Sequence, residues 1–549
     1  MAIKSFIITL TITVSCFQTI LFSQSNFVDV NSRVYNFLSK MSIKGEINFN
    51  EFSLPLTRKE ISEYLKVIDA SKISLTPLER NELEWYLNEY YAETYDENLV
   101  TENPKFFSDD GGRLRPFFFR NENFSYAASP IIKYEMNSFH ENFLLKRFWG
   151  FNVYGNVNKS FSFQFDFREY LEEGDLIDRR KQFTTETGPI ILKASGNNIQ
   201  FSETRGSVIY SNEWLAFGGV KEKFKWGSGE RGNLILSTKA HSFPSIYLKI
   251  SPADWIQFYY MHGWLLSRVR DSLASYKTEI EGRPRNIDRP KYIAMHALQL
   301  NPFNNLSLTF GETIVYSDIS PYWGYLNPFL FYRSVDHMFE GGGGSNVGNN
   351  GSLFMDLKYK PYRGYQLYGS LYIDELSVED ILKGDNARNQ FAWSMGAKAY
   401  GILSPHLGLN IEYTRILPWV YSNFVPTQTY TNSGYLMGHY IGQNADQIFV
   451  QLDYLILRGL ELKLWTEMIR RGGISEVKYQ YLDPGEEFLY GKRMSENRIG
   501  LEISYEVFHD TFAKCYYEYS NIKDEDGTRT PSWQLGKNHA FGISFGYGF

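Results

Sequence analysis

The C-terminal end of this 549-residue chain carries an alternating pattern that few folds can accommodate. Large apolar side chains occupy every second position from residue 541 to the last residue, with only Gly or Ser between them. A strand with this period has one apolar face and one face of small residues. The alternative is an edge strand of a soluble sheet, but there the strand would be unprotected against pairing with other chains. In a closed outer-membrane barrel, its apolar face contacts lipid. We predict a barrel strand whose signal for the barrel-assembly machinery is formed by Phe541, Ile543, Phe545, Tyr547 and Phe549.

The first 23 residues have the pattern of a secretory signal peptide. Lys4 precedes a mostly apolar run over residues 6–22, which Ser, Thr and Gln interrupt too often for a membrane span. We predict cleavage after Ser23, with a lipoprotein signal at Cys16 as the alternative. Without the leader, Cys515 is the only cysteine, so we expect neither an internal disulfide nor a cysteine metal cluster.

The composition supports a barrel in the outer membrane. Aromatic residues make up 17% of the chain although its mean hydropathy is −0.35. No later segment has 18 consecutive apolar residues, so we expect no spanning helix. A barrel has an apolar lipid face, a polar lumen and two aromatic girdles, which accounts for both values. The net charge of −6, with interspersed signs, argues against a nucleic-acid partner.

Residues 31–95 carry a helical rather than a strand period. Three apolar stripes recur there, and two of them follow the capping boxes Thr57 to Glu60 and Thr76 to Glu79. We predict three short amphipathic helices on the periplasmic side, where they either cap or plug the barrel. The predicted division is a signal peptide (1–23), a periplasmic helical segment (24–110) and the barrel (111–549).

From about residue 113 to the end, alternating segments follow one another without a helical interruption. Asp166 and Glu461 stand near the middle of such segments, at positions between large apolar residues. Charged side chains there cannot face hydrocarbon, where Arg or Lys costs about 2–4 kcal/mol, so they must point into a polar lumen. The spacing predicts 16 to 20 strands, with an all-β transmembrane barrel of about 18 antiparallel strands as the fold. Two packed β-sandwich domains are the alternative.

Seven long stretches separate the predicted strands. Barrels have short turns at the periplasmic end and long loops outside, so we assign these stretches to the cell surface. They are residues 171–199, 223–245, 267–290, 317–351, 375–390, 417–446 and 472–497.

Two glycine-rich stretches resemble nucleotide sites but lack their context. Gly227, Gly229 and Gly232 spell G-x-G-x-x-G, yet no helical pattern follows, so we expect tight turns or close backbone packing. The glycines 341–344 lack the Lys-Ser/Thr of a phosphate loop and predict a flexible tip. The chain has no H-E-x-x-H, and its literal G-x-S-x-G, at residues 542–546, belongs to the alternating terminal pattern and surrounds no candidate nucleophile. We therefore expect no enzyme activity, no cofactor and no metal.

Residues 322–336 form the densest aromatic cluster in any predicted loop. Flat aromatic faces beside Arg and Asp suit sugar rings, through stacking and charge-assisted hydrogen bonds. An interfacial aromatic girdle combined with loop packing is the alternative. The predicted glycan-binding residues are Trp323, Tyr325, Tyr332, Arg333 and Asp336.

Several blocks of the chain resemble the capsule-assembly Wzi family of outer-membrane proteins. Residues 327–333, 353–359 and 438–446 are similar to family blocks, although Tyr440 stands where many members have proline. The most specific match is a W-G-x-G…L-I-L-S…P run that contains Trp226, Gly227, Gly229, Leu236, Ser237 and Pro244.

The resemblance implies an 18-stranded barrel with an occluded lumen and periplasmic helices. It implies a lectin-like role in binding or anchoring capsular polysaccharide or exopolysaccharide. Its implied partners are outer-membrane lipid, cell-surface polysaccharide and a periplasmic or capsule-export protein. The leader end and the Tyr/Asn-rich loops resemble a Bacteroidota branch in which some relatives serve gliding or adhesion, so that role is one alternative. A substrate-conducting porin is the other.

Overall fold

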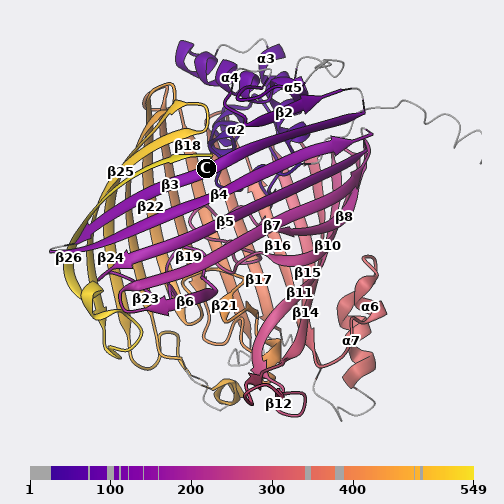
Figure 1. Ribbon diagram of the computed structural model, residues 1–549, viewed down its shortest axis with the longest axis vertical. Helices are drawn as coiled ribbons and strands as arrows, with labels where there is room; N and C mark the ends of the chain where they lie inside the picture. Colours follow the sequence, from indigo (N-terminus) through magenta and orange to yellow (C-terminus); the bar gives the residue numbers. More distant parts are fainter. Residues whose placement is uncertain are drawn as a thin grey trace, which may run out of the picture.

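Antiparallel strands close into a single barrel with a group of helices at one end (Figure 1). The computed structural model describes residues 26–71, 75–94, 104–109, 113–121, 123–139, 141–158, 160–340, 348–376, 389–474, 476–481 and 486–548. The predicted signal peptide, the glycines 341–344 and Phe549 lie outside these ranges.

The barrel is one circuit of eighteen strands, which confirms the predicted fold. Each strand pairs with the next along the chain, and the last pairs with the first to remove both edges. The circuit is β3 (Phe124–Phe139), β4 (Asn142–Val157), β5 (Phe161–Gly174), β7 (Asn198–Ser211), β8 (Leu215–Glu222), β10 (Phe243–Ala253), β11 (Ile256–Arg270), β14 (Asp288–Phe303), β15 (Leu306–Ser317), β16 (Asn350–Tyr359), β17 (Tyr365–Glu375), β18 (Gln390–Tyr400), β19 (Leu407–Ile416), β22 (Ala445–Leu457), β23 (Leu460–Arg471), β24 (Met494–Phe508), β25 (Thr511–Asp524) and β26 (Gly536–Tyr547).

Shorter strands lie beside or inside this circuit. β2 (Phe117–Arg120) pairs with β3, and β6 (Ile191–Ser195) pairs with β7. Three two-stranded pairs are β1 (Ser53–Leu54) with β9 (Lys225–Trp226), β12 (Tyr276–Lys277) with β13 (Pro284–Arg285), and β20 (Thr431–Asn432) with β21 (Tyr435–Leu436).

The wall alternates between apolar and polar side chains as the sequence predicts. On β5, Phe161 and Phe165 are exposed on the outside, whereas Asp166 is buried on the lumen side. On β26, Phe541 and Phe545 likewise face outward. Outward apolar rows meet hydrocarbon, and inward charges find partners in the lumen.

The two ends of the barrel differ. One end has short turns, such as residues 254–255 and 458–459, and the strands that the seven predicted long stretches connect are joined at the other end. The helices of the N-terminal segment, within residues 33–94, lie at the short-turn end, at the top of Figure 1. Arg33 Nη1 donates to the Gly459 carbonyl at 2.7 Å, and the Gly459 N–H donates to Glu82 at 2.6 Å. The helical segment is therefore bonded to the barrel rim.

The predicted helices form with the predicted caps. They are α2 (Arg33–Lys44), α3 (Arg58–Ala70) and α4 (Pro77–Glu89), followed by the short α5 (Tyr91–Thr94). Both capping boxes are present, with Thr57 accepting from the Glu60 N–H and Thr76 from the Glu79 N–H. Their apolar stripes pack into one core that includes Tyr400 of the barrel.

Among the described residues, no helix is both long and apolar enough to cross a membrane.

Candidate functional site

The barrel lumen is filled by chain entering from both ends. From the helix end, residues 47–56 enter between α2 and α3, and from the long-loop end, residues 223–242 and 417–444 fold inward. Phe52, Trp226 and Tyr421 belong to one buried apolar cluster with inward side chains of the wall. We call these three segments the plug. Two of the stretches that the sequence assigns to the cell surface are thus mainly lumen filling, because their apolar residues can be buried there.

The plug segments meet inside the lumen as a two-stranded sheet. Ser53 of β1 pairs with Trp226 of β9, and the Gly227 N–H donates to the Phe52 carbonyl at 2.8 Å. The fully buried Trp226 ring packs against Phe52 and Tyr259, with ring centroids 5.7 and 6.1 Å away. Residues from opposite ends of the barrel therefore share backbone hydrogen bonds.

Glu51 fixes the inserted segment electrostatically. Its carboxylate lies 3.7 Å from Lys398 Nζ and accepts from Ser39 Oγ at 2.7 Å and Gln366 Nε2 at 3.2 Å. Burial alone would raise the pKa of this carboxyl group, but Lys398 and Lys358 together lower the pKa of Glu51 to about 2. The group is ionised at neutral pH and bonded on both oxygens.

The glycines of the G-x-G-x-x-G stretch permit close packing of the plug. Gly227 has φ +118°, which favours glycine. A Cβ on Gly229 would lie 2.0 Å from the Gly232 carbonyl oxygen, and one on Gly232 would lie 2.4 Å from Nε2 of the buried His439. The other family-motif residues divide between plug and wall: Leu236 is buried, Ser237 Oγ donates to the Gly438 carbonyl at 2.6 Å, and Pro244 is exposed on β10.

Two tyrosines connect the inward loops. Tyr421 and Tyr430 donate to the carbonyls of Leu234 and Ile235 at 2.7 and 2.6 Å. Both tyrosine rings pack against Tyr372 of β17. These bonds occupy carbonyls that would otherwise be buried without donors.

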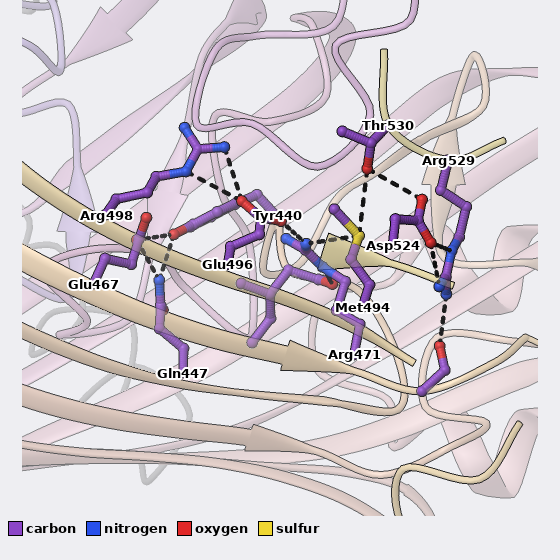
Figure 2. A network of polar contacts seen from close by, with 12 residues as sticks. Tyr440, Gln447, Glu467, Arg471, Met494, Glu496, Arg498, Asp524, Arg529 and Thr530 are labelled. Atoms are coloured by element: carbon purple, nitrogen blue, oxygen red, sulfur yellow. Dashed lines mark hydrogen bonds and ion pairs between the residues drawn. The ribbon is translucent and has the colours of Figure 1, made fainter. Parts of the chain in front are cut away.

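A polar network fastens the plug to the wall near the long-loop end (Figure 2). The Tyr440 hydroxyl donates to Glu467 and accepts from Gln447, and Arg471 Nε donates to the Ile441 carbonyl at 2.9 Å. Arg471 also pairs with Glu496. Tyr440 thus anchors an inward-folding loop to the wall strands β22 and β23.

The same network reaches the neighbouring loops in Figure 2. Glu496 pairs with Arg498 at 2.8 Å, and Arg529 pairs with Asp524 at 2.7 Å. Arg529 also donates to the Gly472 carbonyl at 2.9 Å. Because each of these charges has an opposite partner, the network suits a structural clamp better than an anion site.

Several cavities lie beside the plug, and two of them combine charged and aromatic groups. One has a volume of about 420 Å³ and is lined by polar groups that include Lys40, Glu230 and Asp453. The other has a volume of about 600 Å³ and lies along the β3–β8 side of the wall. In the larger cavity, Tyr170 and Phe201 stack with centroids 4.8 Å apart, beside ion pairs such as Lys223–Glu203 at 2.8 Å. Aromatic rings beside polar groups are the chemistry of sugar sites.

A hairpin stands at the long-loop end between β11 and β14. It contains β12 and β13, with Tyr276 opposite Arg285, and both residues are exposed. Leu273, in the turn between β11 and β12, is fully exposed. This hairpin combines a flat aromatic ring with guanidinium groups at an accessible surface.

The predicted glycan-binding cluster lies elsewhere, in α6 (Trp323–Leu326) and α7 (Tyr332–Glu340). Figure 1 shows both helices beside the outer wall of the barrel. Trp323 and Arg333 are exposed, but Tyr325, Tyr332 and Asp336 are almost completely buried. The structure therefore brings the five residues together, with only two of them accessible to a large ligand.

In the described part of the chain, no group of three His, Cys, Asp or Glu residues is arranged to hold a metal ion. Cys515 lies exposed on β25.

Comparisons with known proteins agree with this architecture. A family model described as "Capsule assembly protein Wzi" matches residues 112–532. Among solved structures, the barrel is similar to Wzi from Escherichia coli, described as a carbohydrate-binding β-barrel involved in group 1 capsule assembly, with 14% identity, a TM-score of 0.57 and coverage of 95% of this chain and 99% of that chain. OprD from Pseudomonas aeruginosa is more distant, with 11% identity, a TM-score of 0.40 and coverage of 77% and 94%. No curated protein matches.

Proposed function

This chain belongs to the capsule assembly protein Wzi family, and on that premise we propose that it is an outer-membrane barrel that binds capsular polysaccharide at the cell surface. The family match over residues 112–532 carries the proposal. The barrel fold, shared with a protein described as carbohydrate-binding, supports it. Binding rather than catalysis is the activity that we infer.

The proposed orientation places the long loops outside the cell and the helices in the periplasm. Barrels of this class keep short turns on the periplasmic side, and the helices are bonded to the short-turn rim. The outer faces of α3 and α4 would then be open to a periplasmic or capsule-export partner. Recognition of the terminal strand by the barrel-assembly machinery belongs to the same proposal.

The filled lumen favours retention of a polymer over its passage. Apolar packing across the lumen and the β1–β9 pairing fill much of the interior of the barrel along the described residues. A porin requires a continuous aqueous path. We therefore favour binding over conduction.

We assign polymer contact to the exposed hairpin of β12 and β13. Tyr276 offers a stacking face, and nearby guanidinium groups pair with uronate or other acidic groups. One ring contributes on the order of 0.5–1.5 kcal/mol, so many repeats must engage many barrels to retain a chain. The cationic side chains at and beside the hairpin are Arg268, Arg270, Lys277, Arg283, Arg285 and Arg289.

The test is a capsule-release assay in cells. The double variant Tyr276→Ala/Arg285→Ala should shed polysaccharide into the medium, more so at high salt, while barrel abundance stays constant. Leu273→Ala, in the exposed turn that precedes the hairpin, is the matched control. Unchanged retention in the double variant would refute the assignment to the hairpin. Release by Trp323→Ala instead would move the sugar contact to α6.

A further inference from the structure

Residues 318–340 form a strap that packs on the outer wall of the barrel rather than over its mouth (Figure 1). The strap contains α6 and α7 and covers parts of β11, β14 and β15. On these strands, Met261, Met295 and Val315 point into the lumen core. Their neighbours in sequence alternate to the other face, so Tyr260, Ala294 and Tyr316 point outward beneath the strap.

Side chains of the outer wall satisfy backbone groups of the strap. The Tyr260 hydroxyl donates to the carbonyls of Tyr325 and Leu326 at 3.1 and 3.0 Å, at the end of α6. The Tyr332 N–H, at the start of α7, donates to Glu312 at 2.6 Å. A segment in water has no need of such partners, whereas one in hydrocarbon requires them.

The strap also covers polar side chains that point away from the lumen. Glu312 lies 3.0 Å from His296 Nε2, and His262 Nε2 lies 2.6 Å from the Tyr316 hydroxyl. Glu312 and His262 are buried, and the Tyr332 ring lies over His296 with centroids 4.6 Å apart. On a bare barrel these groups would face lipid, which is costly for a charged side chain.

Exposed apolar residues flank the strap on the same strands. Towards the long-loop end, Trp264 and Leu266 of β11 are exposed on the outer face. Towards the short-turn end, Leu298 of β14 and Phe310 of β15 are exposed on it. The strap therefore lies within the apolar belt, not beyond its edge.

The outer side of the strap continues this belt. Trp323, Phe329, Leu330 and Phe331 are exposed, with Trp323 at 80% and Phe329 at 68%. Phe329 also stacks on Phe258 of β11, with centroids 5.2 Å apart. We propose that the strap lies in the leaflet on the long-loop side, with these four side chains in lipid hydrocarbon, and that it seals the polar outer wall beneath it.

Site-directed spin labelling in liposomes tests the proposal. In a Cys515→Ser background, Phe329→Cys carries a nitroxide in the purified barrel, reconstituted into phospholipid vesicles. Collision rates are measured with oxygen, which partitions into hydrocarbon, and with a water-soluble nickel chelate. Leu353→Cys, at an exposed position of β16, is the lipid-facing control, and Leu273→Cys, in the fully exposed turn before β12, is the aqueous control.

The label at residue 329 should match that at residue 353, with an oxygen-to-nickel ratio several-fold above that at residue 273. A ratio like that at residue 273 would overturn the proposal. Leu330→Cys provides a second reading if Phe329→Cys folds poorly. Added capsular polysaccharide should leave the ratio unchanged, and protection of the label from the nickel chelate by polysaccharide alone would assign the strap to sugar instead.

Discussion

Glu51 and Tyr440 fasten the plug through different chemistry. Glu51 lies on the segment that enters from the helix end and is held by the lysines of the wall. Tyr440 lies on a loop from the opposite end, and its own hydroxyl forms hydrogen bonds with Gln447 and Glu467. Of these two residues, only Glu51 forms a contact that depends on its own protonation state.

The Glu51 contact should weaken in acid. A carboxyl group with a folded-state pKa below its unfolded value stabilises the fold above the unfolded pKa, and that contribution is lost as pH falls towards the folded one. For Glu51 the window runs from about 4.5 down to about 2, and the contribution is at most about 3 kcal/mol. The gel-shift unfolding temperature of the native protein should fall across this window.

Glu51→Gln separates this group from other carboxylates. The variant should unfold at a lower temperature than the native protein at pH 7, and the difference should shrink as the pH approaches 2. Glu281→Gln, on an exposed hairpin, is the control and should follow the native protein at every pH. A constant difference between Glu51→Gln and the native protein from pH 7 to 2 would show that titration of Glu51 is not involved.

The sequence predicted that the aromatic and charged residues of 322–336 form a cluster, but it did not predict which surface of the protein that cluster contacts. Tyr325, Tyr332 and Asp336 form a compact cluster, as their spacing suggested, but they are buried against the outer wall. Local composition marks an aromatic cluster without revealing which surface covers it. That information comes from the outward row of β11, β14 and β15, which lies at other positions in the chain.

Helices and strands whose pattern depends on residues close together in sequence could be predicted. The capping boxes of α3 and α4 and the alternation of β5 and β26 depend on residues a few positions apart. The insertion of residues 47–56 was missed, although Ile47, Phe49, Phe52, Leu54 and Leu56 are more apolar than a surface connection requires. Their partner β9 lies more than 160 residues away in sequence, so no local pattern indicates the pairing.

The terminal strand β26 should control assembly through its outer row. Phe545→Lys puts a charge in the apolar belt beside β3, so we expect the protein to remain in the periplasm and be degraded. Cell fractionation and heat-modifiable gel migration measure this. Lys537→Glu changes charge on the same strand but at its long-loop end, and should leave outer-membrane levels normal. Normal insertion of Phe545→Lys would contradict this role of the row.

Because the plug fills the lumen, we expect the native barrel to conduct ions poorly. A substitution at Gly232 should loosen the plug and raise the conductance. Gly232→Ala places a Cβ 2.4 Å from His439, so the inward loops must separate, at a cost of about 1–3 kcal/mol. Planar bilayer recordings should show little conductance for the native protein and frequent openings for the variant. Gly219→Ala, where a Cβ meets open space, should stay closed. Equal conductance in all three proteins would mean that the plug does not set permeability.

The pairing of β1 with β9 constrains the order in which the molecule is made. Residue 53 leaves the ribosome long before β26 exists, yet in the finished protein it lies at the centre, enclosed by a wall that closes only when β26 meets β3. A closed ring offers no gap in its side through which β1 could reach β9. Residues 47–56 must therefore either lie inside a curved sheet that has not yet closed, or enter later through the rim of the barrel. In the first case the wall is built around its core instead of being filled after closure.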